Sequence, residues 1–318
     1  LGNSVAAGNL GVVNGEAAAP AAVDTRHSPR DGALSTASPL ASILILCYNR
    51  VEFTRACIAA VLKNTPPGLY ELIVVDNAST DGTPQYLAQL ERERPHVKIV
   101  RSATNLGFVD GNNRAAEIAR GKYLVFLNND TQPQSGWLEA LLSFPENDSS
   151  IGAVGAKLVY PDGRLQEAGA IIFSDASGWN YGRGDDPRHP RYNFFREVDY
   201  CSAACLLVRA DLFNQLGGFD TRFAPAYYED TDLCFALRRA GYRVMYQPEA
   251  VVVHHEGATA GTDLNQGAKQ HQVTNQARFR EKWAEALTQQ FAPNLAQVRR
   301  ASHRAPGKRI LVIDAFLP

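Results

Sequence analysis

Three acidic residues, Glu229, Asp230 and Asp232, directly follow the aromatic pair Tyr227 and Tyr228. Carboxylates beside aromatic rings suit a general base that takes a proton from a bound hydroxyl group. Acidic residues in the first turn of a helix are also ordinary partners of the helix dipole. The segment alone leaves both interpretations open.

A second group offers ligands for a hard cation. Asn128-Asn129-Asp130 follows an apolar run that ends at Leu127, and His254-His255 follows another that ends at Val253. Mg²⁺ and Mn²⁺ prefer oxygen ligands and often keep substrate phosphates among them. Because side chains alternate along a strand, one histidine can face a metal while the next faces away, and the sequence leaves open which one does. An Asn/Asp turn is the alternative for the first segment.

Polar residues follow two earlier apolar runs as well. Cys47-Tyr48-Asn49-Arg50 opens a predicted helix, where backbone amides and an arginine suit a diphosphate or a nucleotide edge. A plain turn capped by Asn49 is the alternative. After the second run, Asp76 can accept a hydrogen bond from a base or a ribose hydroxyl, while the Ser-Thr-Asp stretch that follows it caps the next helix.

The third run is followed by Asn105-Leu106-Gly107-Phe108, and Asn113 lies a little further on, at the start of a predicted helix. Polar side chains and a glycine at this rim permit close approach of a ligand. The signal is weak when it is taken alone.

These residues need elements that bring them together. Short apolar runs alternate with amphipathic segments from residue 42 to residue 142. The predicted strands are Ser42–Cys47, Glu71–Asp76, Val97–Arg101 and Tyr123–Asn128, and the predicted helices are Val51–Leu62, Pro84–Arg92, Val109–Ala119 and Gly136–Leu142. This alternation is typical of an α/β protein with a mainly parallel central sheet flanked by helices. Such sheets bind ligands beyond the carboxyl ends of their strands, where the polar clusters lie.

The second part of the chain is less regular. The predicted elements are strands at Ile151–Tyr160, Leu165–Phe173, Glu197–Val208, Tyr242–Tyr246 and Ala250–His254, and helices at Glu229–Ala240 and Leu264–Leu287. We expect residues 1–40 to be a flexible tail or linker, residues 41–290 to form the main domain, and residues 291–318 to hold a linker and the first strand of a following domain.

Composition excludes some functions. The chain has 318 residues, 45% of them hydrophobic, and a formal net charge of −1, without the basic stripe that nucleic-acid binding needs. The five cysteines lie mostly in apolar runs, so we expect buried free thiols and a cytoplasmic protein, or one attached peripherally to the inner face of the membrane. No apolar run is long enough to span a membrane, and the N-terminus lacks a signal-peptide pattern.

The order of these segments resembles the family 2 glycosyltransferases, and most closely their bacterial rhamnosyltransferase-like branch. The matching segments include Val-Val-Asp-Asn-Ala-Ser-Thr-Asp-Gly, Leu-Asn-Asn-Asp, Tyr-Tyr-Glu-Asp-Thr-Asp-Leu-Cys and Val-His-His-Glu-Gly, and they run in consistent order from Ser42 to Gly261. The resemblance implies a GT-A type fold, with a Rossmann-like nucleotide-binding half and an acceptor-binding half.

The resemblance also implies roles for individual residues. Asp130 and His254 would hold Mg²⁺ or Mn²⁺, and Asp230, with Glu229 beside it, would be the base of an inverting hexosyltransferase. The residues expected to bind the nucleotide-sugar are Cys47, Tyr48, Asn49, Arg50, Asp76, Asn105, Gly107, Asn113, Asn128 and Asn129.

This sequence departs from the family pattern at two places. It has Asn128-Asn129-Asp130 where the family has two aspartates, and Ser202-Ala203-Ala204 where many members have a Gly-Ala pair. The first change leaves one firm carboxylate for the metal, and the second predicts a tighter backbone on the acceptor side.

Partners follow from the resemblance. We expect a nucleotide-diphosphate sugar donor, dTDP-rhamnose by preference, and a glycan or lipid-linked glycan acceptor, with further glycosyltransferase domains in the same polypeptide. A catalytically silent module that binds glycan or nucleotide is the alternative. A dehydrogenase or a nucleotidyltransferase would need a glycine-rich loop after the first strand, and residues 47–51 contain no glycine.

Overall fold

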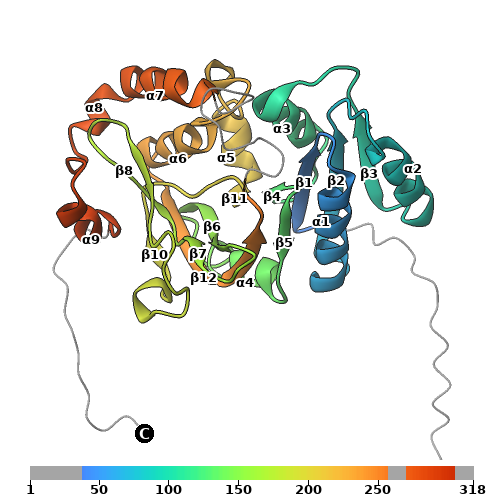
Figure 1. The fold of residues 1–318 in the computed structure, drawn as a ribbon, viewed down its shortest axis with the longest axis horizontal. Coiled ribbons are helices and arrows are strands. Elements are labelled where there is room, and N and C mark those ends of the chain that lie inside the picture. The colour runs from blue at the N-terminus through green and yellow to red at the C-terminus, as the bar shows by residue number, and fades with distance from the viewer. Residues whose placement is uncertain (1–37, 257–269, 305–318) are drawn as a thin grey trace, which may run out of the picture. The chain divides into compact units, whose positions relative to one another are not determined.

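The computed structural model describes residues 38–256 and 270–304 (Figure 1). All of these residues belong to one compact unit that begins at Ala37. The tail expected over most of residues 1–40, and the strand expected near the C-terminus, lie outside the described residues.

The first half alternates strand and helix, as the apolar periodicity predicted. Its elements are β1 (Ala41–Cys47), α1 (Val51–Asn64), β2 (Tyr70–Asp76), α2 (Thr83–Glu93), β3 (Val97–Arg101), α3 (Gly107–Glu117) and β4 (Tyr123–Asn128). The four strands are parallel neighbours in the order β3-β2-β1-β4. Their register pairs Cys47 with Asp76 and Leu46 with Asn128, so the polar residues that follow the strands meet at one edge of the sheet.

The second half is more irregular. Its elements are β5 (Thr131–Pro133), α4 (Trp137–Ser143), β6 (Ile151–Val159), β7 (Leu165–Glu167), β8 (Ala170–Ile172), β9 (Gly178–Asn180), η1 (Pro190–Tyr192), β10 (Arg196–Glu197), β11 (Cys205–Arg209), α5 (Ala210–Gln215), η2 (Thr221–Phe223), α6 (Glu229–Arg239), β12 (Arg243–His254), α7 (His271–Lys282), α8 (Ala284–Leu287), η4 (Leu295–Gln297) and α9 (Val298–Ala301).

One large sheet joins the two halves in the order β10-β12-β6-β11-β4-β1-β2-β3. The pair β12-β6 is parallel, whereas β11 is antiparallel to both β4 and β6. The short strands β5 and β7 pair with β12 and β6, and β8 and β9 form a separate hairpin. The structure therefore confirms a mixed α/β fold whose central sheet is mostly parallel.

Helices cover both faces of the sheet. Side chains of β1 alternate between the two faces, since Ile43 and Ile45 pack in one apolar cluster and Leu44 packs in the other. Helices α1, α2 and α4 contribute to the first cluster, and α3, α5 and α6 contribute to the second. Each fully buried Leu or Ile side chain is worth about 1.5–3 kcal/mol over an exposed one, so burial on both faces holds the strand ends in place.

Four predicted strands are wrong in detail. The strand expected at 165–173 breaks into β7 and β8 at Gly169, whose φ of +67° turns the chain out of the large sheet. The strand expected at 197–208 is only β10 and β11, which lie at different places in that sheet. The two strands expected at 242–254 form one strand, β12, whose pairing with β6 shifts register between Gln247 and Val251.

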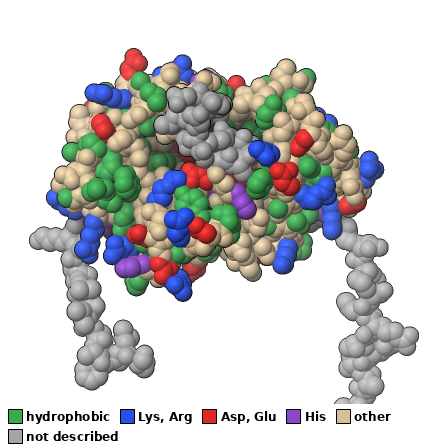
Figure 2. Space-filling view, viewed as in Figure 1, with side chains coloured by type: hydrophobic (Ala, Val, Ile, Leu, Met, Phe, Trp, Pro, Cys, Tyr) green, Lys and Arg blue, Asp and Glu red, His purple; other side chains and the backbone are tan. Residues whose placement is uncertain are grey.

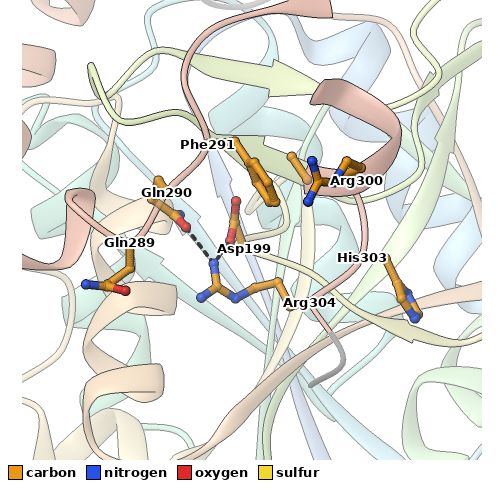
Figure 3. Close-up of a pocket in the computed structure, with 8 residues that line it drawn as sticks. Asp199, Gln289, Gln290, Phe291, Arg300, His303 and Arg304 are labelled. Atoms are coloured by element: carbon orange, nitrogen blue, oxygen red, sulfur yellow. Dashed lines mark hydrogen bonds and ion pairs between the residues drawn. The ribbon is translucent and has the colours of Figure 1, made fainter. Parts of the chain in front are cut away.

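The C-terminal part also differs from the prediction. The described part of the long helix expected at 264–287 is divided into α7 and α8 at Trp283. Residues 291–304, expected to be a linker, form η4 and α9, and Ala301 packs with Ile171 and Phe173. Beyond them, Arg304 forms an ion pair with the buried Asp199 (Figure 3).

All five cysteines are free and buried, as predicted. Among the described residues, none of the helices combines the length and the apolar character that crossing a bilayer requires.

Candidate active site

Asp130 and His254 meet at one end of the sheet. Antiparallel pairing of β5 with β12 sets Thr131 opposite His254, and the backbone N–H of His255 donates to the carbonyl of Asp130 at 3.0 Å. The Oδ1 of Asp130 and the Nε2 of His254 lie 3.3 Å apart. Both residues are buried, at 5% and 8% exposure, so this contact is fixed by the backbone around it.

His255 faces away from Asp130. Its ring lies against Phe53 of α1, with ring centroids 5.2 Å apart, and its Nε2 contacts the amide of Gln132 at 3.3 Å. The alternation of side chains along β12 thus directs His254, rather than His255, toward the carboxylate.

Asn128 and Asn129 support the turn that presents Asp130. The carbonyl of Asn128 accepts a hydrogen bond from the Thr131 hydroxyl at 2.6 Å, and the side chain of Asn129 donates to the Thr54 hydroxyl of α1 at 3.0 Å. Asn129 is buried and directed at that helix, so its contacts hold the turn.

The pair Asp130 and His254 fits a divalent cation. Two ligands that bind one cation at about 2.1 Å each, at right angles, lie roughly 3 Å apart, close to the observed separation. Across residues 38–256 and 270–304, no cluster of three or more His, Cys, Asp or Glu side chains is arranged to hold a metal. Mg²⁺ sites are commonly built from one or two carboxylates, with water and substrate phosphates as the other ligands.

Asp230 lies in the first turn of α6, directly after two tyrosines with positive φ, 74° at Tyr227 and 71° at Tyr228. Its carboxylate accepts hydrogen bonds from the backbone N–H groups of Ala203, at 3.1 Å, and Thr231, at 2.6 Å. Desolvation raises the pKa of Asp230, and these hydrogen bonds only partly oppose it. A carboxylate with a raised pKa is a stronger base than an ordinary aspartate.

The two other acids of this turn have different surroundings. Glu229 is buried, its Oε2 has no hydrogen-bond partner among the described residues, and burial raises its pKa well above the ordinary value. Asp232 accepts hydrogen bonds from the indole of Trp283 at 2.7 Å and from Lys282 at 2.8 Å, which ties α6 to α7. The turn therefore presents Asp230, while Glu229 and Asp232 are directed into the protein.

Tyr227 lies within electrostatic range of both Asp130 and Asp230. Burial raises the pKa of its hydroxyl to about 12, and four nearby carboxylates add to this effect, those of Glu229, Glu256, Asp130 and Asp230. Asp130 and Asp230, 100 positions apart in the sequence, thus act on the same tyrosine. On the face shown in Figure 2, acidic and histidine side chains lie near one another at the middle of the molecule.

The segment 47–50 makes a tight corner between β1 and α1. Asn49 and Arg50 have φ of 55° and 57°, and Asn49 is held by the loop after β2, because its Oδ1 accepts from the Thr80 N–H at 2.7 Å. Asn49 does not cap α1 with its side chain. Tyr48, at 39% exposure, and Arg50 present exposed side chains at this rim.

Cys47 points away from the rim. Its thiol is buried and donates to the carbonyl of Val75 at 3.2 Å, and burial raises its pKa. Cys47 was expected to bind the nucleotide-sugar, but its side chain belongs to the core.

The loop after β2 serves both to present Asp76 and to start two helices. Asp76 is buried and accepts a hydrogen bond from the Ser79 N–H at 3.0 Å. Asp81 accepts from Val51 and from Thr83, the first residues of α1 and α2, at 3.0 and 2.9 Å. The predicted capping role of this stretch is thus filled by Asp81 at both helices.

After β3, Asn105 and Asn113 form hydrogen bonds with backbone and side-chain groups of the protein itself. The Oδ1 of Asn105 accepts from the side chain of Asn77 at 2.8 Å and from the Gly107 N–H at 2.9 Å. Asn113 exchanges two hydrogen bonds with the backbone of Phe219, at 2.8 and 2.9 Å.

Gly107 makes room for a neighbouring loop. It has a φ of +73°, and a Cβ at this position would lie 2.7 Å from the side chain of Pro225. Sequence reasoning expected a ligand to approach here, whereas in the structure the close approach is made by the loop that precedes α6.

The sequence analysis missed a group of residues behind the site. Gln166 and Glu167 of β7 are both buried. The side chain of Gln166 contacts His254, and Glu167 accepts a hydrogen bond from the Ser202 N–H at 3.0 Å, next to the Ala203 N–H that binds Asp230. The sequence held no signal for them, because they follow an ordinary hairpin turn.

A pocket of about 420 Å³ lies elsewhere, against α9 (Figure 3). It is lined by Asp199, Gln289, Gln290, Phe291, Arg300, Ala301, His303 and Arg304. None of the residues predicted to do chemistry lines it.

Solved structures share the architecture. The chain superposes on GalNAc-T7, solved with UDP, GalNAc and Mn²⁺, with a TM-score of 0.64 and 15% identity over 78% of this chain and 49% of that one. It superposes on the mannosyltransferase PcManGT from Pyrobaculum calidifontis, solved with GDP-Man and Mn²⁺, with a TM-score of 0.56 and 19% identity over 84% and 69%. The fold is that of the GT-A glycosyltransferases.

The sequence places the chain in one family of the GT-A glycosyltransferases. Residues 42–217 match Glycosyl transferase family 2, and the chain belongs to that family.

Three curated relatives carry the comparison further. The chain is 30% identical to the uncharacterized protein y4gI of Sinorhizobium fredii, over 82% of its own length and 30% of that protein's. It is 30% identical to the O-antigen biosynthesis protein RfbC of Myxococcus xanthus, over 71% and 18%. It is 32% identical to the N-acetylglucosaminyl-diphospho-decaprenol L-rhamnosyltransferase of Mycobacterium tuberculosis, over 60% and 68%. The chain thus spans less than a third of the length of the first two.

Proposed function

We propose that this chain is a metal-assisted inverting glycosyltransferase, with Asp230 as its general base and with Asp130 and His254 as its ligands for Mg²⁺ or Mn²⁺. The observation that carries the proposal is the 3.3 Å contact between Asp130 and His254, which come from strand ends more than 100 positions apart. A carboxylate with a raised pKa, Asp230, acts on the same tyrosine as Asp130.

The proposed reaction is a direct displacement. Asp230 takes the proton of an acceptor hydroxyl while the hydroxyl oxygen forms a bond to the anomeric carbon of the donor sugar. The bond from that carbon to the diphosphate breaks, and the nucleoside diphosphate leaves with the electron pair. When bound, the divalent cation would neutralise negative charge on the diphosphate.

The residues of this chain supply positioning. Asp230 is held by the N–H groups of Ala203 and Thr231, so its proton-accepting oxygens have a fixed direction. Desolvation raises its pKa and outweighs the hydrogen bonds that favour the charged form, so it is a stronger base. Tyr48 and Arg50 are exposed at the rim where the nucleotide would lie.

The donor and the acceptor are proposed from the relatives. The Mycobacterium tuberculosis relative is an L-rhamnosyltransferase and the Myxococcus xanthus relative is an O-antigen biosynthesis protein. We propose dTDP-rhamnose as the donor and a glycan or lipid-linked glycan as the acceptor.

The experiment is a panel of nucleotide sugars that includes dTDP-rhamnose, UDP-sugars and GDP-mannose, each tested with and without Mn²⁺. Thermal shift reports binding, and release of the nucleoside diphosphate reports turnover. We expect one donor to raise the melting temperature only with Mn²⁺ and to be hydrolysed slowly without acceptor. Binding of a donor with no turnover under any condition, with or without added glycans, would identify the chain as a silent binding module.

A further inference from the structure

A buried glutamine stands directly behind the proposed metal ligand. Gln166, at 2% exposure, lies in β7, and its Oε1 is 2.7 Å from the Nδ1 of His254. Strands β7 and β12 both pair with the last residues of β6, which brings Gln166 to the histidine across the end of that strand.

This contact decides which nitrogen of the ring carries the proton. An amide oxygen can only accept a hydrogen bond, so the Nδ1 of His254 must donate and must hold the proton. The Nε2 of a neutral ring then bears a lone pair, and it faces the Oδ1 of Asp130 at 3.3 Å. Two acceptors directed at each other are favourable only with a cation between them, either a metal ion or the second ring proton of an imidazolium.

The orientation of Gln166 is itself fixed. Its Nε2 donates to the Oε2 of Glu256 at 3.2 Å. If the amide were turned over, its oxygen would face the Glu256 carboxylate and its nitrogen would face a ring nitrogen that can no longer donate to it. The same oxygen of Glu256 accepts from the hydroxyl of Tyr160 at 2.8 Å and from Arg183 at 2.6 Å, which holds this carboxylate in place.

We infer that Gln166 is a positioning residue that presets His254 for metal binding, by holding its Nδ1 proton and directing its Nε2 lone pair toward Asp130. The inference rests on the proposed function, because it assumes that a cation binds between Asp130 and His254. Partners of this kind typically contribute 10- to 100-fold to metal affinity.

Three variants of the whole chain test the role of Gln166. Gln166→Leu removes the acceptor for Nδ1 at similar volume. The exchange Gln166→Glu with Glu256→Gln keeps an acceptor for the Nδ1 of His254, because the new carboxylate at position 166 faces the histidine. The new amide at position 256 then donates a hydrogen bond to that carboxylate. Gln132→Leu is the matched control, since it removes the equivalent contact from His255.

The first measurement is Mn²⁺ affinity, followed by the EPR signal of free Mn²⁺ with saturating dTDP or UDP present. We expect Gln166→Leu to weaken binding about 10- to 100-fold, while the exchange and Gln132→Leu stay close to wild type. Equal affinity of Gln166→Leu and wild type would overturn the inference. If Gln166→Leu does not fold, loss of Mn²⁺ binding in a folded exchange variant would overturn it as well.

The second measurement needs no metal. Long-range ¹H–¹⁵N correlation spectra of ¹⁵N-histidine-labelled protein report the tautomer of His254, assigned by comparison with His254→Leu. We expect the Nδ1–H tautomer in wild type and in the exchange, and its loss in Gln166→Leu. If wild type shows this tautomer but binds no Mn²⁺, the metal-assisted function fails and the positioning of the ring by Gln166 stands. An Nε2–H tautomer in wild type would refute the role of Gln166 directly.

Discussion

Asn275, in the middle of α7, donates a hydrogen bond to the carbonyl oxygen of Tyr227 at 3.0 Å. The same amide nitrogen reaches the carbonyls of Phe223, at 2.7 Å, and Ala226, at 2.8 Å. One fully buried side chain thus holds the loop that leads into the acidic turn of α6. Tyr227 has a positive φ, a conformation that persists in a non-glycine residue only where its surroundings enforce it.

Replacing Asn275 with Leu should destabilise the protein. Several buried carbonyls would lose their donor, and each buried polar group left without a partner costs about 1–3 kcal/mol. We expect the free energy of unfolding to fall by about 2–4 kcal/mol, measured by urea denaturation. Thr274→Ala, on the exposed side of the same helix, is the control and should change it by less than about 0.5 kcal/mol. A loss for Asn275→Leu as small as that of the control would show that the loop is held by other contacts.

Asp230→Asn should abolish transfer and leave binding intact. Asparagine keeps only one of the two hydrogen bonds from Ala203 and Thr231, because these bind different oxygens of Asp230, and it cannot take a proton. We expect kcat to fall about 10²- to 10⁴-fold, with donor binding by thermal shift unchanged.

The matched control for Asp230 is Asp232→Asn, in the same helical turn. Asp232 binds Trp283 and Lys282, so this change should lower the melting temperature. At temperatures where the variant is still folded, its kcat should stay within a few-fold of wild type. Near-normal turnover in Asp230→Asn would remove Asp230 from its proposed role.

His254, the last residue of β12, and His255, which follows it, should differ sharply in their effect on Mn²⁺ binding. His254→Leu should remove the Mn²⁺-dependent part of the thermal shift caused by the donor, because it deletes one of two proposed protein ligands. His255→Leu should retain that shift, since His255 packs on Phe53. Loss of the Mn²⁺ effect in His255→Leu alone would mean that the structure assigns the wrong histidine to the cation.

Stability should depend on pH through Glu167. Burial is the main cause that raises the pKa of this carboxyl from 4.5 to about 8. Between those two pH values the folded protein holds a proton that the unfolded chain has released, so this contribution to stability is complete below pH 4.5 and is lost as pH rises toward 8.

The variant Glu167→Gln removes this dependence, because its side chain stays neutral. Relative to wild type, it should gain stability between pH 5 and pH 8 in urea denaturation at each pH. A difference between the two proteins that is constant with pH would show that Glu167 is already ionised in the fold.

Local patterns were enough to predict the first half of the fold. The strands from Ser42 to Asn128 are mainly apolar runs separated by amphipathic helices, and their predicted ends fall within about two residues of the observed ones. Prediction failed where non-local contacts decide the structure. The segment 197–208 is mostly apolar, but only its ends belong to strands of the large sheet, because β10 and β11 find different partners there.

The site was predicted to a similar extent. Residue types at strand ends selected Asp130 and the pair His254-His255, and the family resemblance pointed to His254; the structure brings Asp130 and His254 into contact. The contacts of Asn113 and Gly107 depend on Phe219 and Pro225, which lie more than 100 positions further along the chain. Gln166 and Glu167 could not be found, because their importance comes from burial beside His254 and Asp230, and no local pattern records it.

Strand β11 has a consequence for any attempt to divide the protein. Residues 205–209 come long after β4 in the sequence, yet they pair with β4 on one side and β6 on the other. A fragment that ended near residue 150 would keep every strand of the alternating half and would leave the long apolar edge of β4 without a partner. Such an edge recruits strands from other molecules. The half that holds β1 to β4 is therefore expected to aggregate when expressed by itself, and a shortened version of this protein would have to retain the chain at least through Arg209.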